Sequence, residues 1–336
     1  MCSPKYQWHE VCASLVYGRG WKKTEPEFGR LPSHAENKLP GKVWLMRRNS
    51  SGMYVEFCTN SSSLAVRWNL EDDTFGEINF NVCAYSGLDI FCLANGQWRF
   101  TAAPNALSRQ NEVELWQDLE KKERRFRIYF PLRNCVESIS VGVDEACDFA
   151  WKEPGEQPQI VYYGSSIIHG SSTSRAGNGI TSLLGRAFDR SVVNLGFSGA
   201  AKLEMGIAEL LAETEAYIYI VDALPNCDTA LVEERLEPFL RYLCAAKKNT
   251  RVFLLTDADR RGTWLFPEKV RAHREKRAAA KKIVSRLQQE FPLLHLIDMA
   301  PGMGKDFEGT VDGVHPDELG VFRFSTYLIR KLRKFL

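Results

Sequence analysis

The chain has 336 residues, of which 44% are hydrophobic and 26% are charged, and its 44 basic and 42 acidic residues leave a net charge of +2. This composition is typical of a folded globular protein, and the length is sufficient for two domains. The near balance of charge gives no indication of a nucleic-acid partner, and no apolar run is long enough to cross a bilayer, so we expect neither nucleic acid nor a membrane as a partner.

The opening segment and the cysteines indicate a compartment. Residues 1–15 lack the continuous apolar run of a signal peptide. The nine cysteines are scattered and include no C-x-x-C pair, which argues against a disulfide framework and against a cysteine metal site. We therefore expect a cytoplasmic protein that binds no metal.

Short strands are expected between about residues 40 and 148. Segments that alternate apolar and polar residues, or nearly do so, are separated by turn-forming stretches such as TNSSS and ANGQ. These segments are residues 53–57, 63–70, 77–82, 125–130 and 137–143. Many short strands without long helical stretches predict an antiparallel sandwich or jelly roll, which we assign to residues 1–153. Its Trp68, Trp98 and Trp116 either pack in the core or stack on sugar rings, and we favour the core.

The pattern changes after a linker, residues 148–159, that contains two prolines and a glycine. Five apolar strands then alternate with helical segments such as residues 231–246, whose apolar side chains share one face. The strands are residues 160–163, 191–196, 216–223, 251–257 and 294–298. This alternation predicts a parallel five-stranded sheet covered by helices on both sides, which we assign to residues 154–336.

The first of these strands breaks into Gly164-Ser165-Ser166, which allows two interpretations. A serine can cap the helix that follows a turn of this kind. Alternatively, Ser166 is held at the end of the strand as a nucleophile. Ligands of open parallel sheets bind beyond the carboxyl ends of the strands, which is where Ser166 lies, so the second interpretation is favoured.

A serine nucleophile requires a base, usually a histidine that a carboxylate orients. Of the six histidines, His315 follows the fifth strand in the segment TVDGVHPDELG, and Asp312 lies three residues before it. An Asp-x-x-His loop can bring the carboxylate to the imidazole Nδ1–H while Nε2 faces the serine. The alternative is a polar loop in which Asp317 caps the next helix. His169, three residues beyond Ser166, is a further candidate to line a pocket.

Four segments, YGSSI, NLGFSG, LPN and DGVHP, resemble in order and spacing the four sequence blocks of the SGNH (GDSL-type) serine hydrolases. The chain resembles more narrowly the branch in which a β-sandwich with a G-x-D-L-Y segment precedes the catalytic domain, since GLDIF stands at residues 87–91. This resemblance implies a flavodoxin-like α/β hydrolase domain preceded by an all-β, jelly-roll-like domain. A nucleotide site is the main competitor, but the chain has neither G-x-G-x-x-G after the first strand nor G-x-x-x-x-G-K-[ST].

The resemblance also implies roles for individual residues. Ser166 matches the nucleophile, and Asp312 and His315 match the orienting acid and the base. The backbone N–H groups of Ser166 and Gly199 and the side-chain amide of Asn226 match the donors of an oxyanion hole. No metal or organic cofactor is implied.

The family pattern has two departures in this chain and one further match. Ser165 replaces the usual Asp or Thr before the nucleophile, a residue that takes no part in the chemistry. Pro225-Asn226-Cys227 replaces G-x-N-D, which removes an acid after the asparagine. Arg175 matches a position where the branch usually has Arg, and we assign it, with His169, to substrate binding; a salt-bridged or surface arginine is an equal alternative.

These features predict a serine esterase that hydrolyses acyl esters, with an acetyl ester of a carbohydrate or a related small polar molecule as the leading substrate. An acyltransferase would use the same residues with an alcohol acceptor in place of water. A non-catalytic carbohydrate-binding protein is an alternative from another class. The expected partner is a small-molecule or oligosaccharide ester, and the sequence leaves open the acyl length, the sugar and a homo-oligomeric state.

Overall fold

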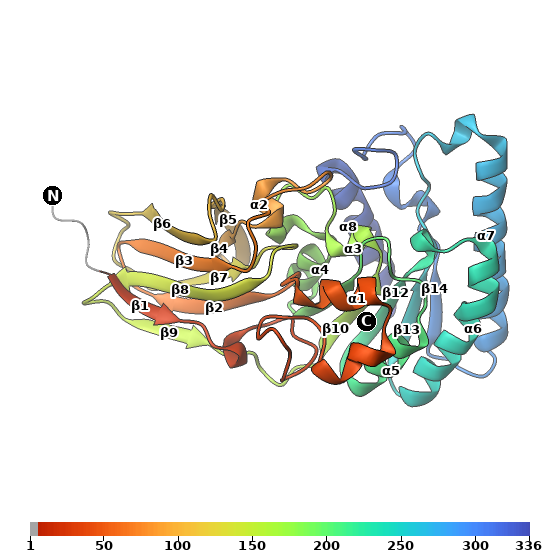
Figure 1. Cartoon of the computed structure of the whole chain (residues 1–336), viewed down its shortest axis with the longest axis horizontal. Coiled ribbons are helices and arrows are strands. Elements are labelled where there is room, and N and C mark those ends of the chain that lie inside the picture. The colour runs from red at the N-terminus through yellow and green to blue at the C-terminus, as the bar shows by residue number, and fades with distance from the viewer. Residues whose placement is uncertain (1–5) are drawn as a thin grey trace. The chain divides into compact units, whose positions relative to one another are not determined.

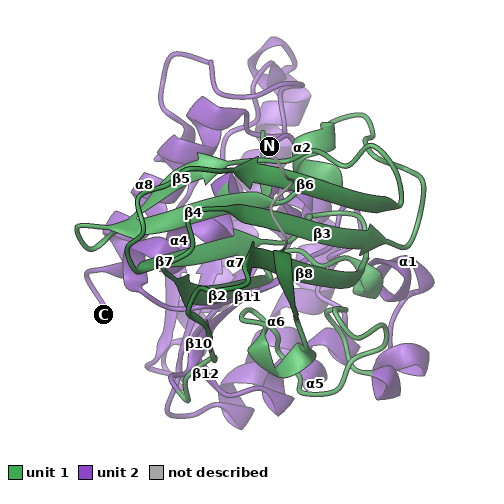
Figure 2. Cartoon of the chain, turned by 90° about the vertical axis from the view of Figure 1, so that its left-hand side faces the viewer, with its two compact units in different colours: residues 1–32, 47–156, 174–177 green, residues 33–46, 157–173, 178–336 purple. Residues whose placement is uncertain are grey.

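The computed structural model describes residues 6–336, and the first five residues of the opening segment lie outside it. The described chain forms two compact units (Figure 2). Unit 1 contains the chain up to Pro32 and residues 47–156 and 174–177, and unit 2 contains residues 33–46, 157–173 and 178–336. The main change of unit, after residue 156, lies close to the predicted boundary between residues 153 and 154. Residues 33–46 belong to unit 2 although they precede this boundary, and residues 174–177 belong to unit 1 although they follow it.

Unit 1 is an all-β sandwich of two antiparallel sheets, as the sequence predicts. The first sheet has the order β1-β8-β3-β6, and its strands are β1 (Tyr6–Glu10), β3 (Leu64–Leu70), β6 (Gln110–Trp116) and β8 (Val136–Asp144). The second has the order β5-β4-β7-β2-β9, and its strands are β2 (Tyr54–Thr59), β4 (Asp89–Ala94), β5 (Gln97–Ala102), β7 (Arg124–Tyr129) and β9 (Phe149–Lys152). Both sheets contribute to one core, in which Phe57, Val66 and Trp68 are fully buried. The indole N–H of Trp68 donates to the carbonyl of Ser86 at 3.1 Å, so the core interpretation of Trp68 is confirmed.

The predicted strand at residues 77–82 is wrong. In this segment Glu77 pairs with Phe80 in an isolated antiparallel bridge, and Asn79 between them has a φ of 67°. Asn81 then caps the helix α2 (Val82–Tyr85), because its side chain accepts a hydrogen bond from the first turn. Ile78 is 92% exposed, so the apolar and polar alternation that suggested a strand does not mark a buried face. The two asparagines favour a turn and a cap instead.

The sheet of unit 2 is parallel and has the order β11-β10-β12-β13-β14, which is the flavodoxin-like order. Its strands are β10 (Gln159–Gly164), β11 (Val192–Gly196), β12 (Ala216–Asp222), β13 (Arg251–Leu255) and β14 (Leu294–Ile297). All five predicted apolar strands are therefore confirmed. The order reverses between β10 and β12, and in folds of this kind ligands bind beyond the carboxyl ends of the strands at such a point.

Helices cover both faces of this sheet (Figure 1). The helices of unit 2 are α1 (Gly41–Leu45), α3 (Ser166–His169), α4 (Ile180–Phe188), α5 (Met205–Glu213), α6 (Thr229–Ala246), α7 (Pro267–Leu287) and α8 (Glu318–Leu332). Apolar residues of α4 and α8 pack with Ile160, Ile218 and Phe253 of the strands in one cluster. Tyr163 of β10 stacks on Phe239 of α6, with 5.6 Å between the ring centroids, and α6 packs against α7.

Within residues 6–336, no helix is both long and apolar enough to span a membrane. In the same range, no group of three or more His, Cys, Asp or Glu side chains is arranged to hold a metal ion. The described cysteines, from Cys12 to Cys244, are free thiols.

Candidate active site

The turn after β10 gives its two adjacent serines different contacts. The hydroxyl oxygen of Ser165 accepts a hydrogen bond from the backbone N–H of Ile167 at 3.3 Å and caps the short helix α3. The hydroxyl of Ser166, the first residue of α3, lies 2.8 Å from Nε2 of His315. The two sequence interpretations therefore apply to different residues: the cap is Ser165, and the serine that contacts a histidine is Ser166.

Two glycines allow this turn to lie close to its neighbours. A Cβ on Gly196, the last residue of β11, would lie 2.1 Å from the backbone nitrogen of His169. A Cβ on Gly164 would lie 2.6 Å from the side chain of Ile168. Glycine at both positions thus permits α3 to pack directly against β11, which fixes the backbone of Ser166.

His315 lies on the loop between β14 and α8, and Asp312 lies on the same loop. Nδ1 of His315 is 2.7 Å from Oδ2 of Asp312, so Ser166, His315 and Asp312 form a continuous hydrogen-bonded series. The other carboxylate oxygen of Asp312 accepts the backbone N–H groups of Val314 at 2.9 Å and of His315 at 2.8 Å. The carboxylate therefore holds both the imidazole and the backbone of its loop.

The environment of Asp312 keeps this carboxylate ionised. Burial alone raises the pKa of Asp312, but the hydrogen bonds from His315 and Val314 and the attraction of the imidazole outweigh burial and lower the pKa to about 2. At neutral pH, Asp312 is therefore an anion beside Nδ1 of His315.

The predicted donor Gly199 lies on the loop after β11. In the parallel register Gly164 pairs with Gly196, so this loop begins beside the Ser166 turn. Gly199 has a φ of 62°, a left-handed conformation that favours glycine. Nζ of Lys42 lies 3.0 Å from the position of a Cβ on Gly199, which places an ammonium group next to this loop.

The predicted donor Asn226 lies on the loop after β12. Gly164 also pairs with Asp222, the last residue of β12, so this loop begins on the other side of the Ser166 turn. Asn226 ends the short 3-10 turn η5 (Leu224–Asn226). Its side-chain Nδ2 is buried and has no hydrogen-bond partner among residues 6–336. A buried amide without a partner costs free energy in the unliganded protein, and such groups in native structures commonly have a function.

The two predicted substrate-binding residues have structural contacts. His169 is fully buried, and its Nδ1 lies 3.0 Å from the hydroxyl of Ser198, so its side chain does not face an open pocket. Arg175, in unit 1, donates to both carboxylate oxygens of Asp89 at 2.9 Å, and its guanidinium lies 3.8 Å from the ring centroid of Phe100. The salt-bridged alternative thus describes Arg175. Asp89 is the acidic residue of the GLDIF segment, and it is fully buried.

Sequence reasoning missed Asn194, a polar residue inside the apolar strand β11. It is buried, and its Nδ2 donates to the carbonyl of Ile168 at 2.8 Å and to the hydroxyl of Thr181 at 3.1 Å. Its Oδ1 accepts the backbone N–H of Gly196 at 2.9 Å. Asn194 therefore ties α3 to β11 next to Ser166, and the signal was a single amide in an otherwise apolar strand.

Models of two protein families match the chain. The GDSL-like lipase/acylhydrolase family model matches residues 157–333, more than half of the chain. The chain belongs to the GDSL-like lipase/acylhydrolase family. A second model, that of the N-terminus of SGNH-type esterases (GxDLY), matches residues 6–149. The resemblance drawn from the four motifs and from GLDIF is therefore confirmed for both parts of this GDSL-like protein.

Solved structures share the fold over nearly the whole length of the GDSL-like chain. A protein from Bacteroides ovatus ATCC 8483 described as a GDSL-like lipase is 27% identical, with a TM-score of 0.91 over 98% of each chain. Salicylyl-acyltransferase SsfX3 from a tetracycline biosynthetic pathway is 16% identical, with a TM-score of 0.77 over 98% of this chain and 97% of that one. A family two carbohydrate esterase from Cellvibrio japonicus is 13% identical, with a TM-score of 0.63 over 98% of each chain. A comparison with curated proteins returned no match.

Proposed function

We propose that the protein is a serine esterase. In this proposal Ser166 is the nucleophile, His315 is the general base, and Asp312 orients the base and stabilises its protonated form. The observation that carries this proposal is the continuous contact from the serine hydroxyl to Nε2, at 2.8 Å, and from Nδ1 to the carboxylate, at 2.7 Å. These distances lie within the range that proton transfer between neighbouring groups requires. A carbohydrate-binding protein without catalysis has no need of this series, which argues against the non-catalytic alternative.

The reaction follows from the positions of these groups. The hydroxyl oxygen of Ser166 attacks the ester carbonyl while Nε2 of His315 takes the hydroxyl proton. The bond to the alcohol oxygen then breaks, and the leaving alcohol takes that proton from Nε2. Water attacks the acyl-enzyme, gives a proton to Nε2, and releases the acid as Ser166 recovers its proton. The negative charge of Asp312 stabilises the imidazolium that forms in both steps.

The negative oxygen of each tetrahedral intermediate requires donors that are fixed in advance. The proposed donors are the backbone N–H groups of Ser166 and Gly199 and the side-chain amide of Asn226. The buried, unpartnered Nδ2 of Asn226 supports this role, since a substrate oxygen would supply the missing acceptor. The register of β10 with β11 and β12 supports it as well, because all three donors then follow neighbouring strand ends.

For the substrate, we propose an acyl ester, acetyl first, of a carbohydrate or a related small polar alcohol. Support comes from the fold shared with a family two carbohydrate esterase over 98% of both chains. An acyltransferase with an alcohol acceptor is the second candidate, supported by the fold shared with a salicylyl-acyltransferase at a TM-score of 0.77. Water and an alcohol acceptor would approach the same acyl-enzyme, so the two activities differ in the acceptor and not in the residues.

One experiment tests the nucleophile without knowledge of the substrate. A fluorophosphonate should add a single phosphonyl group to the intact protein, on the peptide that contains Ser166, and Ser166→Ala should prevent the addition. Ser165→Ala is the matched control, because it removes the adjacent hydroxyl, which contacts Ile167 and not His315. The control should lose some stability through the missing cap and still be labelled. Labelling of Ser166→Ala would contradict the proposed nucleophile.

A second experiment separates hydrolysis from transfer. The protein is incubated with acyl esters of increasing chain length and with acetylated oligosaccharides, with and without added alcohol or sugar acceptors, and the products are read by mass spectrometry. An esterase should release the free acid in every case. An acylated acceptor as the main product would replace the esterase by the acyltransferase.

A further inference from the structure

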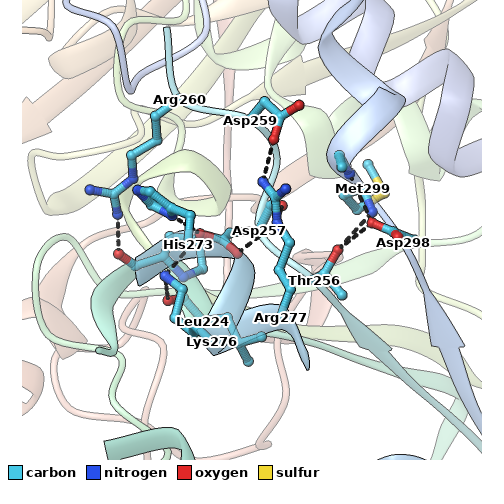
Figure 3. Close-up of polar contacts among 12 residues, drawn as sticks. Leu224, Thr256, Asp257, Asp259, Arg260, His273, Lys276, Arg277, Asp298 and Met299 are labelled. Carbon is cyan, nitrogen blue, oxygen red and sulfur yellow. Dashed lines mark hydrogen bonds and ion pairs between the residues drawn. The ribbon is translucent and has the colours of Figure 1, made fainter. Parts of the chain in front are cut away.

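A buried cluster of charged side chains lies next to the turn that carries Asn226 (Figure 3). Asp257, which follows β13, is 2% exposed, and Lys276 of α7 is 4% exposed. Their Nζ and Oδ2 atoms are 2.8 Å apart. His273, one turn earlier on α7, places Nδ1 at 3.0 Å from the same oxygen, and Nε of Arg277 donates to the backbone carbonyl of Asp257 at 3.1 Å. Charges buried in this way are costly unless each one is well paired.

The ammonium of Lys276 has two further hydrogen bonds, which reach the turn on either side of Asn226. Nζ donates to the backbone carbonyl of Leu224 at 3.0 Å (Figure 3) and to that of Cys227 at 3.1 Å. Together with Asp257, these acceptors use all three N–H groups of the ammonium. A residue of α7 thus bridges the two ends of a segment whose middle carries the proposed oxyanion donor.

A second basic side chain holds the same turn. The guanidinium of Arg260, which is labelled in Figure 3, donates to the backbone carbonyl of Pro225, the residue just before Asn226. The turn itself has few hydrogen bonds of its own: the N–H of Asn226 donates to Ala223 and that of Cys227 to Leu224, both at 3.1 Å. A short 3-10 turn of this kind is weak in isolation. Its backbone therefore depends on contacts from outside.

The carboxylate of Asp257 stays ionised, which keeps it paired with Lys276. Burial raises the pKa of Asp257, but the hydrogen bond from His273 and the attraction of Lys276 and Arg277 outweigh it and lower the pKa to about 2. The carboxylate is therefore an anion at neutral pH, where it pairs with the ammonium of Lys276.

We propose that Lys276, held by Asp257, is a positioning residue that fixes Asn226 as an oxyanion donor by binding the carbonyl groups on both sides of it. The inference rests on the proposed function, since it requires Asn226 to donate to the oxyanion. A donor contributes most when its position is set before the reaction begins. Loss of the ammonium would release the turn and leave the buried Asp257 with His273 and Arg277 as its remaining partners.

The first test is Lys276→Met, which keeps most of the side-chain volume and removes the three donors. Two rates are measured: kcat and KM with p-nitrophenyl acetate, and the rate of phosphonylation of Ser166 by a fluorophosphonate, whose phosphoryl oxygen would use the same donors. We expect kcat and the phosphonylation rate to fall by about 10-fold or more. The upper limit is the loss of about 10²–10³ that complete removal of one donor causes. KM should change by less than about twofold, because the donor acts on the intermediate more than on the bound ester.

The second test combines Lys276→Met with Asn226→Ala. If Lys276 acts through Asn226, the double variant should be as slow as Asn226→Ala alone, within about twofold, because the group that Lys276 positions is already absent. A merely stabilising role of Lys276 would instead slow both backgrounds equally. Lys276→Gln should recover part of the rate, since an amide retains N–H groups for one of the two carbonyls.

The matched control is Lys281→Met on the same helix. Nζ of Lys281 is 2.6 Å from Oδ2 of Asp298, which follows β14, so this is also a lysine of α7 paired with an aspartate at a strand end. Among residues 6–336, its ammonium contacts Asp298 and has no hydrogen bond to the Asn226 turn, so we expect both rates to stay within about twofold of the wild type. Arg260→Gln, which loses the contact with Pro225, is the second variant, and its rate loss should likewise disappear in the Asn226→Ala background.

The outcomes separate this inference from the proposed function. Equal losses with and without Asn226, or a normal rate for folded Lys276→Met, would overturn the positioning role while Asn226→Ala remains slow. If Lys276→Met does not fold, Lys276→Gln and Arg260→Gln decide in the same way. If Asn226→Ala is itself as fast as the wild type, the oxyanion role of Asn226 is wrong, and the positioning role is overturned with it.

Discussion

The turn that carries Ser166 and the loop that carries His315 are held by different forces. Around the turn, Ser165 and His169 are fully buried, and the backbone lies so close to Gly196 that no side chain fits between them. The loop is more open: the side chain of Asp312 is 34% exposed, and its neighbour Val311 is 53% exposed. Close packing, together with the hydrogen bonds of Asn194, holds the first region, and hydrogen bonds hold the more open second region.

The His315 loop has hydrogen bonds within itself and with residues outside it. Within the loop, the N–H of Val311 donates to the carbonyl of His315 at 3.0 Å. From outside, the side chain of Arg261 donates to the backbone carbonyls of Met303 at 2.6 Å, Gly304 at 3.2 Å and Glu308 at 3.1 Å, and Arg323 of α8 donates to the carboxylate of Asp306. Damage to a packed region is expected to affect the whole fold, whereas each lost hydrogen bond should displace the loop by a small amount.

The largest effect on the loop should come from Asp312→Asn. The amide oxygen can still accept the two backbone N–H groups of the loop, but its NH₂ faces Nδ1 and favours the wrong imidazole tautomer. We expect kcat to fall by about 10⁴-fold, while the protein stays folded with a melting temperature lower by a few degrees, because the variant loses the stabilisation of the charged carboxylate. Steady-state kinetics and thermal unfolding of the same preparation provide the measurement. A variant within about tenfold of the wild-type rate would show that Asp312 does not orient His315.

The next effect should come from Gly196→Ala, which tests the packed turn. The added methyl group would meet backbone atoms of His169 at 2.1 and 2.6 Å, so α3 has to move away from β11. We expect a loss of about 1–3 kcal/mol or more in the free energy of unfolding, together with a loss of activity, since Ser166 moves with α3. Gly41→Ala is the control, because a Cβ on Gly41 has no atom within 4 Å. Equal unfolding free energies for the two variants would contradict the packing argument.

A smaller effect is expected from Arg261→Gln, which tests the hydrogen-bonded loop. The change removes the guanidinium and keeps the backbone N–H of residue 261, which donates to Gly313 at 2.8 Å. We expect a loss of about 1–2 kcal/mol in stability and about a tenfold fall in kcat as the loop loosens. Arg271→Gln on α7 is the control, because the side chain of Arg271 is 74% exposed and its pair with Glu275 is weak. An Arg261 variant indistinguishable from this control would remove Arg261 from the support of the loop.

The smallest effect concerns stability in acid. The folded-state pKa of Asp312 is lowered from 3.8 to about 2, so its contribution to stability is present above about pH 4 and is lost as the pH falls through about 2. The melting temperature of the wild type should therefore fall more between pH 4 and pH 2 than that of Asp312→Asn, which lacks this group. Parallel curves for the two proteins over this range would mean that the carboxylate gains no stabilisation in the fold.

The sequence predicts the strand ends of unit 2 well, because buried parallel strands are apolar throughout and the polar residues that follow them stand out. Ser166 and His315 are predicted in this way, His315 together with its acid at a fixed spacing, whereas the role of Asn226 is predicted from the resemblance of LPN to a family motif. The fold of both units also followed from the contrast between short alternating strands and apolar strands separated by helices. The strand predicted at residues 77–82 is wrong because a short alternation of apolar and polar residues also occurs in an exposed turn.

Residues that act between elements far apart in the chain could not be predicted. Lys276 belongs to a basic stretch of α7 whose sequence is typical of a solvent-exposed helix face. Its side chain is nevertheless buried and binds Leu224 and Cys227, about fifty residues earlier in the chain. Asp89 and Arg175 are 86 residues apart, and neither segment alone indicates their ion pair. Such contacts depend on how the elements pack and not on local periodicity.

The contact between Ser166 and His315 spans 149 positions of the chain. During synthesis, the serine is therefore complete long before the histidine that would activate it, and until then its hydroxyl is an ordinary alcohol with little reactivity. A chain that stops before residue 315, or that has not yet closed its last loop, would carry no competent nucleophile. Activity would then indicate that folding is complete, because Ser166 follows the first strand of the sheet, His315 follows the last, and both strands must be in place.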